Sequence, residues 1–202
     1  MRPKLKLNNI SSLHDARYCS AVGVDLLAFS MGNNAEGGLR TAQIAEIMDW
    51  LSGPESVGEF GFESPDEIAT QAASAKLHWI SVPFDYPSPT ATELPENLIF
   101  RHRELSLEQV PNLLQLAGQF PKALFEFSIS EEGVWNALKQ NDLIPRSILN
   151  FSAPDPIYAM LTREGFKPFA FSLGDFVEEP DGHLDYETCD DFIEEFQSLV
   201  VA

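Results

Sequence analysis

Basic residues are scarce in this chain. It has 13 Lys and Arg against 31 Asp and Glu among 202 residues, which gives a formal net charge of −18. Binding to the phosphates of nucleic acids or of an anionic membrane surface depends on clustered Lys and Arg. The composition therefore argues against both kinds of partner, and we predict no nucleic-acid and no membrane partner.

Cysteines are also few. Cys19 and Cys189 lie far apart in segments of helical period, and no second cysteine or histidine stands at metal-binding spacing near either. We interpret both as buried or idle thiols. The four histidines fall in different parts of the chain, and no acidic segment has the spacing of a calcium loop. We predict no metal site and no cofactor.

Long apolar runs are absent as well. No run approaches the roughly 18 residues that a membrane-spanning helix needs. The start Met1–Lys6 is not followed by the apolar stretch of a signal peptide. We therefore expect a cytoplasmic protein.

Apolar residues are nevertheless plentiful in shorter segments. Hydrophobic residues make up 44% of the chain and include 15 Phe, enough for a sizeable core. The charged fraction of 22% is too low for a disordered polyelectrolyte. The composition predicts a folded globular chain.

Short apolar or β-branched segments alternate with longer stretches of helical period. This alternation is typical of a parallel sheet covered by helices. Helix starts between the strands carry a hydroxyl three residues before an acid or amide, as at Ser12, Ser64 and Ser106. The expected strands are Lys4–Asn8, Asp25–Ser30, Val57–Phe62, Leu77–Val82, Leu98–His102, Ala123–Phe127, Ser147–Asn150 and Pro168–Ser172.

Eight strand–helix units in 202 residues leave about 25 residues each, near the lower limit for a (β/α)8 barrel. An open doubly wound sheet is the alternative, but the sequence has neither of the glycine motifs that bind dinucleotides or phosphates in such folds. No linker is evident. We predict an α/β fold, a single (β/α)8 TIM barrel over residues 1–202. Residues 83–97 hold four prolines, so we expect the fourth helix to be shortened or replaced by loop.

Three segments carry a resemblance to a known family. The first runs from Lys6 through Asn8 and Asp15 to Gly23-Val-Asp25, the second pairs Val57-Gly58 with Ser64-x-x-Glu67, and the third is Val177-Glu178 with Gly182 and Asp185. In order and spacing they resemble phosphoribosylanthranilate isomerase, a barrel enzyme of tryptophan biosynthesis. The resemblance implies the barrel fold and an intramolecular aldose–ketose isomerisation, an Amadori rearrangement.

The resemblance also implies where catalytic residues would stand. The family has a cysteine base at the end of strand one and an aspartate acid at the end of strand six. Those positions fall on Asn8 and Glu126. An amide cannot abstract a proton, and loss of a positioned general base costs about 10²–10⁴ in rate. Glu126 keeps a carboxylate, one methylene further out, and is either a general acid or base or part of a structural network.

The substrate-binding positions depart from the family pattern too. The phosphate-binding glycines after strands seven and eight align with the segments around Asn150 and Asp175, where a carboxylate would repel a phosphate. The family has an arginine that binds the substrate carboxylate, and an alignment without gaps places no arginine at that position. Arg40 takes its place only if the alignment of this loop shifts by three residues. Arg101 and Arg103 lie at the end of the fifth strand, on the same side of it. They are either an anion anchor or part of a solvated rim in which they pair with acids. We favour the rim.

These departures leave three functions open. We favour an isomerase-like barrel that has lost the Amadori reaction and now acts as a binding barrel or as an enzyme with a changed substrate. A divergent but active isomerase, with Glu126 as its acid, is the alternative. The third is a subunit that binds a partner through an exposed apolar patch. We expect a small-molecule ligand at the C-terminal mouth of the barrel and a monomer or homodimer.

Overall fold

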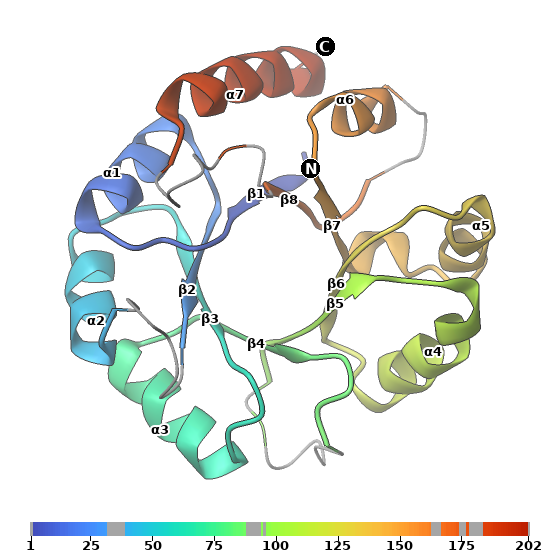
Figure 1. Cartoon of the computed structure of the whole chain (residues 1–202), viewed down its shortest axis with the longest axis horizontal. Helices are drawn as coiled ribbons and strands as arrows, with labels where there is room; N and C mark the ends of the chain where they lie inside the picture. Colours follow the sequence, from blue (N-terminus) through green and yellow to red (C-terminus); the bar gives the residue numbers. More distant parts are fainter. Residues whose placement is uncertain are drawn as a thin grey trace.

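The strands close into a parallel barrel. The computed structural model describes residues 2–31, 39–87, 94, 96–162, 167–173, 177 and 184–201. The strands pair in sequence order, and β1 pairs with β8 to complete the ring (Figure 1). They are β1 (Lys4–Leu7), β2 (Leu26–Ser30), β3 (Glu55–Glu59), β4 (Trp79–Pro83), β5 (Leu98–Glu104), β6 (Leu124–Ser128), β7 (Ser147–Phe151) and β8 (Ala170–Leu173).

Helices form the outer ring of the barrel (Figure 1). They are α1 (Leu13–Val22), α2 (Thr41–Asp49), α3 (Pro65–Ala75), α4 (Val110–Gln119), α5 (Glu132–Gln140), α6 (Asp155–Leu161) and α7 (Tyr186–Val201), with short 3₁₀ helices η1 (Leu107–Gln109) and η2 (Ile144–Arg146). Ser12 and Ser64 cap α1 and α3 as predicted, because each hydroxyl accepts from the backbone N–H three residues on. Between β4 and β5, the described residues 84–87, 94 and 96–97 form no helix, in agreement with the proline content.

Two apolar layers stabilise the barrel. The larger one lies between the sheet and the helices. A smaller layer fills the lumen, and most strands contribute one or two apolar side chains to it. These are Leu26, Ala28, Val57, Ile99, Leu124, Ile148 and Ala170. Since successive residues of a strand point to opposite faces, these side chains define which positions of each strand face the lumen.

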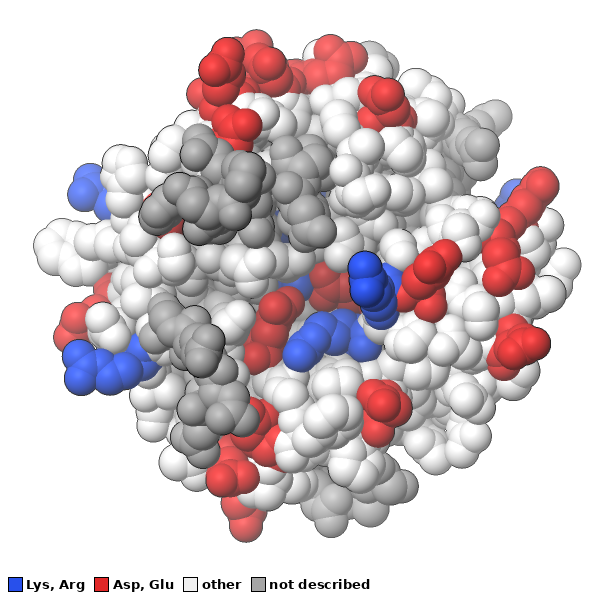
Figure 2. All heavy atoms as spheres, in the orientation of Figure 1, with Lys and Arg blue, Asp and Glu red and all other residues white. Residues whose placement is uncertain are grey.

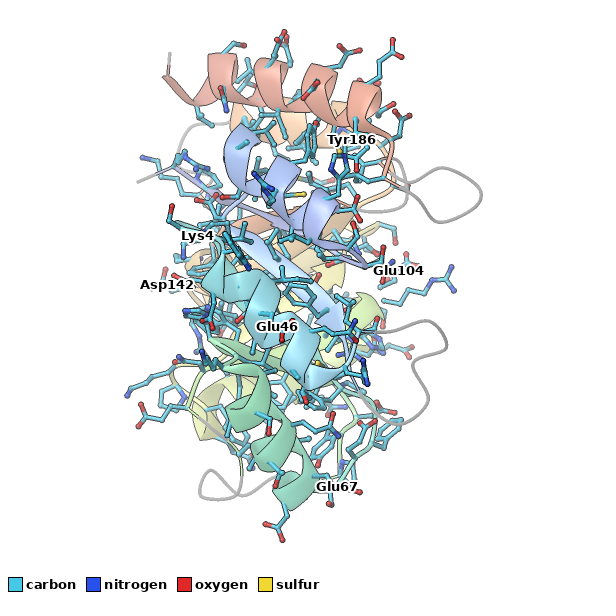
Figure 3. The ribbon with its side chains drawn as sticks, turned by 90° about the vertical axis from the view of Figure 1, so that its left-hand side faces the viewer. Lys4, Glu46, Glu67, Glu104, Asp142 and Tyr186 are labelled. Atoms are coloured by element: carbon cyan, nitrogen blue, oxygen red, sulfur yellow. The ribbon has the colours of Figure 1, made fainter. Side chains whose placement is uncertain are left out.

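The end of the barrel where the strands begin is closed by a polar and aromatic group. Lys4 pairs with Glu55 at 3.1 Å and lies over the Phe169 ring, and the Trp79 indole also donates to Glu55. In Figure 3, Lys4 and Asp142 lie on this side of the molecule and Glu104 and Tyr186 lie on the opposite side. The strands therefore end at the side of Glu104, where barrel enzymes carry their active sites.

The first and last helices lie side by side and share polar contacts (Figure 1). Tyr18 of α1 donates to Asp190 of α7 at 2.6 Å, and Tyr186 of α7 donates to Asp15 of α1 at 2.6 Å. Cys19 and Cys189 are both buried free thiols, as predicted. Burial raises the pKa of each, that of Cys189 to about 12, so both stay protonated at neutral pH.

None of the helices within the described part of the chain is both long enough and apolar enough to cross a membrane. Within the same residues, no three His, Cys, Asp or Glu side chains gather as metal ligands would.

Candidate functional site

A polar layer lies above the apolar lumen, toward the ends of the strands. Each of its members stands two residues after a lumen-facing residue and so faces inward as well. Figure 2 shows acidic and basic side chains meeting at the centre of the barrel face. The inward polar residues are Lys6, Asn8, Ser30, Glu59, Ser81, Arg101, Glu126, Asn150 and Ser172.

Lys6 is the centre of this layer. Its side chain is fully buried, and its Nζ donates to both oxygens of Glu126 at 2.9 and 2.8 Å, to Oε1 of Glu59 at 2.7 Å and to Oδ1 of Asn8 at 2.7 Å. An ammonium has three N–H donors, and here they face three acceptor side chains, from β3, from β6 and from the residue that follows β1 by one position. The cation therefore holds β1, β3 and β6 together inside the barrel.

The charges at this centre stabilise one another. Burial alone would lower the pKa of Lys6, but the charges and hydrogen bonds of Glu126 and Glu59 outweigh it and raise the pKa above its ordinary 10.5. Burial would raise the pKa of Glu59, but the charges of Lys6 and Arg101 outweigh it and lower the pKa below 4.5. Lys6 and Glu59 are consequently both charged at neutral pH.

Asn8 is occupied at both ends of its amide. Its Oδ1 accepts from Lys6 at 2.7 Å, and its Nδ2 donates to the Ser172 hydroxyl at 3.1 Å. The next residue, Asn9, has φ 56, the left-handed conformation expected for the turn between β1 and α1. Asn8 thus links the buried cation to β8 and fixes the polar layer at the end of β1.

Arg101 is fixed by the strands beside it. Its Nη1 donates to the backbone oxygen of Ser81 at 2.9 Å and to the Ser81 hydroxyl at 3.2 Å, and its Nη2 donates to the backbone oxygen of Phe60. Arg103 is exposed and follows an irregularity in the β5–β6 register. Within the described part of the chain neither arginine forms an ion pair with an acid, contrary to the favoured interpretation of a solvated, acid-paired rim.

Solved phosphoribosylanthranilate isomerases have the same arrangement of strands and helices. A monomeric form of the dimeric enzyme from Thermotoga maritima has a TM-score of 0.75 and 18% identity, over 97% of this chain and 99% of that one. The chain has the fold of these isomerases. The N-(5'-phosphoribosyl)anthranilate isomerase from Pyrococcus furiosus matches with a TM-score of 0.74 and 15% identity, over 98% of this chain and 100% of that one. The predicted resemblance is confirmed at the level of the fold.

The same fold also matches a different protein, KGPDC from Streptococcus mutans, with a TM-score of 0.67 and 12% identity over 98% of this chain and 99% of that one. No family model and no curated protein matches the sequence. Because one fold serves many chemistries, the likeness to the isomerases shows the architecture, and the activity has to be argued from the site.

Within the isomerase fold, the two residues at the expected catalytic positions are brought together. Asn8 and Glu126 both bind Lys6, although neither contacts the other through a hydrogen bond in the described structure. Glu126 is buried, and both of its oxygens face the Lys6 ammonium. It is therefore the ion-pair partner of a lysine, in the middle of β6.

The remaining predicted ligand contacts are more scattered. Asn150 is half-buried on β7 opposite Ser172 of β8, and so belongs to the inward polar layer. Arg40 lies at the start of α2, where its Nε donates to Gln43 at 3.2 Å, and no contact joins it to the polar layer of the described residues. Asp175 lies outside the described residues.

Sequence reasoning did not select Lys6, Glu59, Ser81 or Ser172 as site residues. A usable signal was present in the strands, because Lys6 lies two residues before Asn8, and Glu59 two residues after Val57. A charged residue in phase with the lumen-facing positions of a short apolar strand faces the inside of the barrel. Lys6 was noted only as a match to the family pattern.

Proposed function

We propose that this barrel does not catalyse the Amadori rearrangement and that it binds a small polar molecule on the inward polar layer at its C-terminal mouth. The observation that carries the first part is the state of Asn8. The residue at the position of the family base is an amide, and both ends of that amide are already hydrogen-bonded, to Lys6 and to Ser172. No proton acceptor for the substrate remains there.

The position of the family acid gives further support. Both oxygens of Glu126 accept hydrogen bonds from Lys6 inside the barrel, and its side chain is only 5% exposed. A general acid must reach the substrate oxygen that it protonates. Glu126 instead faces an ammonium that keeps it in an ion pair.

The cost of the polar layer supports a binding role for it. Apolar side chains in place of a buried ion network are often neutral or stabilising by about 1–4 kcal/mol. The lumen below the layer is filled by apolar residues, and this fold could be filled in the same way above. A fully buried lysine and a buried glutamate at the mouth of a barrel are therefore best explained by a ligand that they help to position.

Complementation tests the loss of the isomerase reaction. The gene would be expressed in a tryptophan auxotroph that lacks the isomerase, with the Thermotoga maritima enzyme as the positive control. We expect no growth without tryptophan, while immunoblotting shows soluble protein. Growth comparable with that of the control would establish the alternative, a divergent but active isomerase of tryptophan biosynthesis.

A further inference from the structure

Glu59 and Arg101 form a pair of opposite charges that do not meet. Both point into the mouth, from β3 and β5, and the charge of Arg101 contributes to the lowered pKa of Glu59. Yet no ion pair joins them in the described structure, because Arg101 is held toward Ser81 and Phe60. The two groups face the same mouth without pairing with each other.

Each group has hydrogen-bonding capacity left over. Glu59 accepts from Lys6 through Oε1, and its Oε2 makes no hydrogen bond with any described residue. The Glu59 side chain is 16% exposed, against 5% for Glu126, so it is the more accessible of the two carboxylates. Arg101 uses Nη1 and Nη2 toward the protein, and its Nε–H makes no hydrogen bond within the described part of the chain.

The formal charges of the polar layer restrict what can lie between these groups. Lys6 and Arg101 balance Glu59 and Glu126, so the four ionisable groups sum to zero. A phosphate ester would bring about two negative charges to a layer with no positive excess, inside a chain of net charge −18. An amino acid, whose ammonium offsets its carboxylate, adds no net charge to the layer, and a hydroxy acid adds one negative charge, about half that of a phosphate ester.

We propose that Glu59 and Arg101 together bind a small carboxylic acid with an amino or hydroxyl group next to its carboxylate. The ligand carboxylate accepts hydrogen bonds from the Arg101 guanidinium, which its contacts with Ser81 and Phe60 hold in place. The amino or hydroxyl group donates to Oε2 of Glu59. This assignment rests on the proposed binding function, because it names the class of ligand for the same mouth.

Calorimetric titration of the purified chain tests the assignment. The probes are alanine and serine as amino acids, lactate and glycerate as hydroxy acids, and ribose 5-phosphate, glycerol 3-phosphate and inorganic phosphate as anions without that pairing. We expect saturable binding of a member of the first two groups and none of the phosphates at the same concentration. The better of the two groups identifies whether the donor is an amine or a hydroxyl.

Matched variants locate the binding. Glu59→Gln and Arg101→Lys are each expected to weaken it about tenfold or more, since each removes a charge-assisted or forked hydrogen bond. Glu55→Gln at the other end of β3, and Arg146→Lys, an arginine whose hydrogen bonds go to backbone oxygens away from the mouth, are the controls and should leave binding unchanged. Circular dichroism of every variant checks that it folds. The Glu59→Asp variant keeps the negative charge and should bind the ligand more tightly than Glu59→Gln does.

The outcomes separate the two proposals. Two results would overturn the ligand class and leave the loss of isomerase activity intact. One is that a phosphate binds more tightly than every amino and hydroxy acid. The other is that no amino or hydroxy acid binds at roughly 10 mM, about the weakest affinity worth assigning. Equal effects of the mouth variants and the controls would also overturn it. Turnover of N-(5'-phosphoribosyl)anthranilate by the same sample would overturn the proposed function instead.

Discussion

Lys6 and Glu126 are 120 residues apart in the chain and meet inside the barrel, where the lysine Nζ lies 2.9 and 2.8 Å from the two carboxylate oxygens. The contact joins the first strand to the sixth across the lumen. Glu59 of the third strand completes the group at 2.7 Å from the same nitrogen. One buried cation thus links three strands at the mouth of the barrel.

Replacement of Lys6 by Met is expected to destabilise the protein strongly. It leaves Glu59 and Glu126 without their shared cation, and breaking a buried ion pair costs about 3–5 kcal/mol. Urea denaturation gives the free energy of unfolding. Lys4→Met is the matched control on the same strand, where the lysine is 28% exposed and its ion pair is worth about 1 kcal/mol or less. Equal losses for the two variants would contradict the central role of Lys6.

Stability should depend on Glu59 at acid pH. The folded-state pKa of Glu59 is lowered below 4.5, so its contribution is present above pH 4.5 and is lost as the pH falls toward the folded-state value. In Glu59→Gln the decline of the unfolding free energy below pH 4.5 is expected to be shallower than in the wild type. Denaturation curves in a series of acid buffers measure this. Parallel curves for the two proteins would show that Glu59 carries no such linkage.

The two thiols should be unreactive in the folded protein. Cys19 and Cys189 are buried, and burial raises the pKa of both, so little thiolate is present at pH 8. We expect iodoacetamide to label neither cysteine in native buffer. It should label both in about 8 M urea, which unfolds most small proteins. Mass spectrometry counts the adducts. Rapid labelling of the native protein would show that the interface of α1 and α7 opens readily.

Two glycines should respond to alanine in opposite directions. A Cβ at Gly58 on β3 would collide with the Leu77 side chain, so Gly58→Ala is expected to cost about 1–3 kcal/mol. A Cβ at Gly118 in α4 would meet nothing within 4 Å, and Gly118→Ala is expected to stabilise the protein by about 0.5–1 kcal/mol. Thermal denaturation of both variants checks the pair. A neutral Gly58→Ala would mean that β3 and the segment before β4 are packed more loosely than described.

A base restored at position 8 should not restore catalysis. Asn8→Cys supplies the thiol that the family uses, but the substrate phosphate still lacks its glycine-rich contacts next to Asn150. We expect turnover by this variant to stay at least about 10²-fold below that of an authentic isomerase. The assay is the conversion of N-(5'-phosphoribosyl)anthranilate. Activity within tenfold of the standard would place the whole defect at the base.

Much of the fold could be predicted from the sequence because each strand is a short apolar segment followed by a helix with its own cap. The boundaries were less exact, by up to three residues at the end of β3 and by two at the starts of β3, β4 and β8. β3 starts at Glu55, two residues before the predicted start, and Glu55 is held there by Lys4 of β1 and Trp79 of β4. Such partners come together only when the barrel closes.

The site was predictable only in part for the same reason. Asn8 and Glu126 were selected through a family pattern, and both lie in the polar layer. Their shared contact with Lys6, and the contact of Lys6 with Glu59, link residues from three strands through the register of the closed sheet. No local pattern contains that register. Arg101 was selected as an anion anchor or rim residue, but its orientation depends on backbone oxygens of two other segments.

The most direct test of the account is the rate at which the purified wild-type protein converts N-(5'-phosphoribosyl)anthranilate, measured beside the Thermotoga maritima isomerase under the same conditions. An amide in place of the base predicts a rate lower by about 10²–10⁴ or more. A rate within tenfold of the standard that scales with protein concentration would contradict the loss of the isomerase reaction.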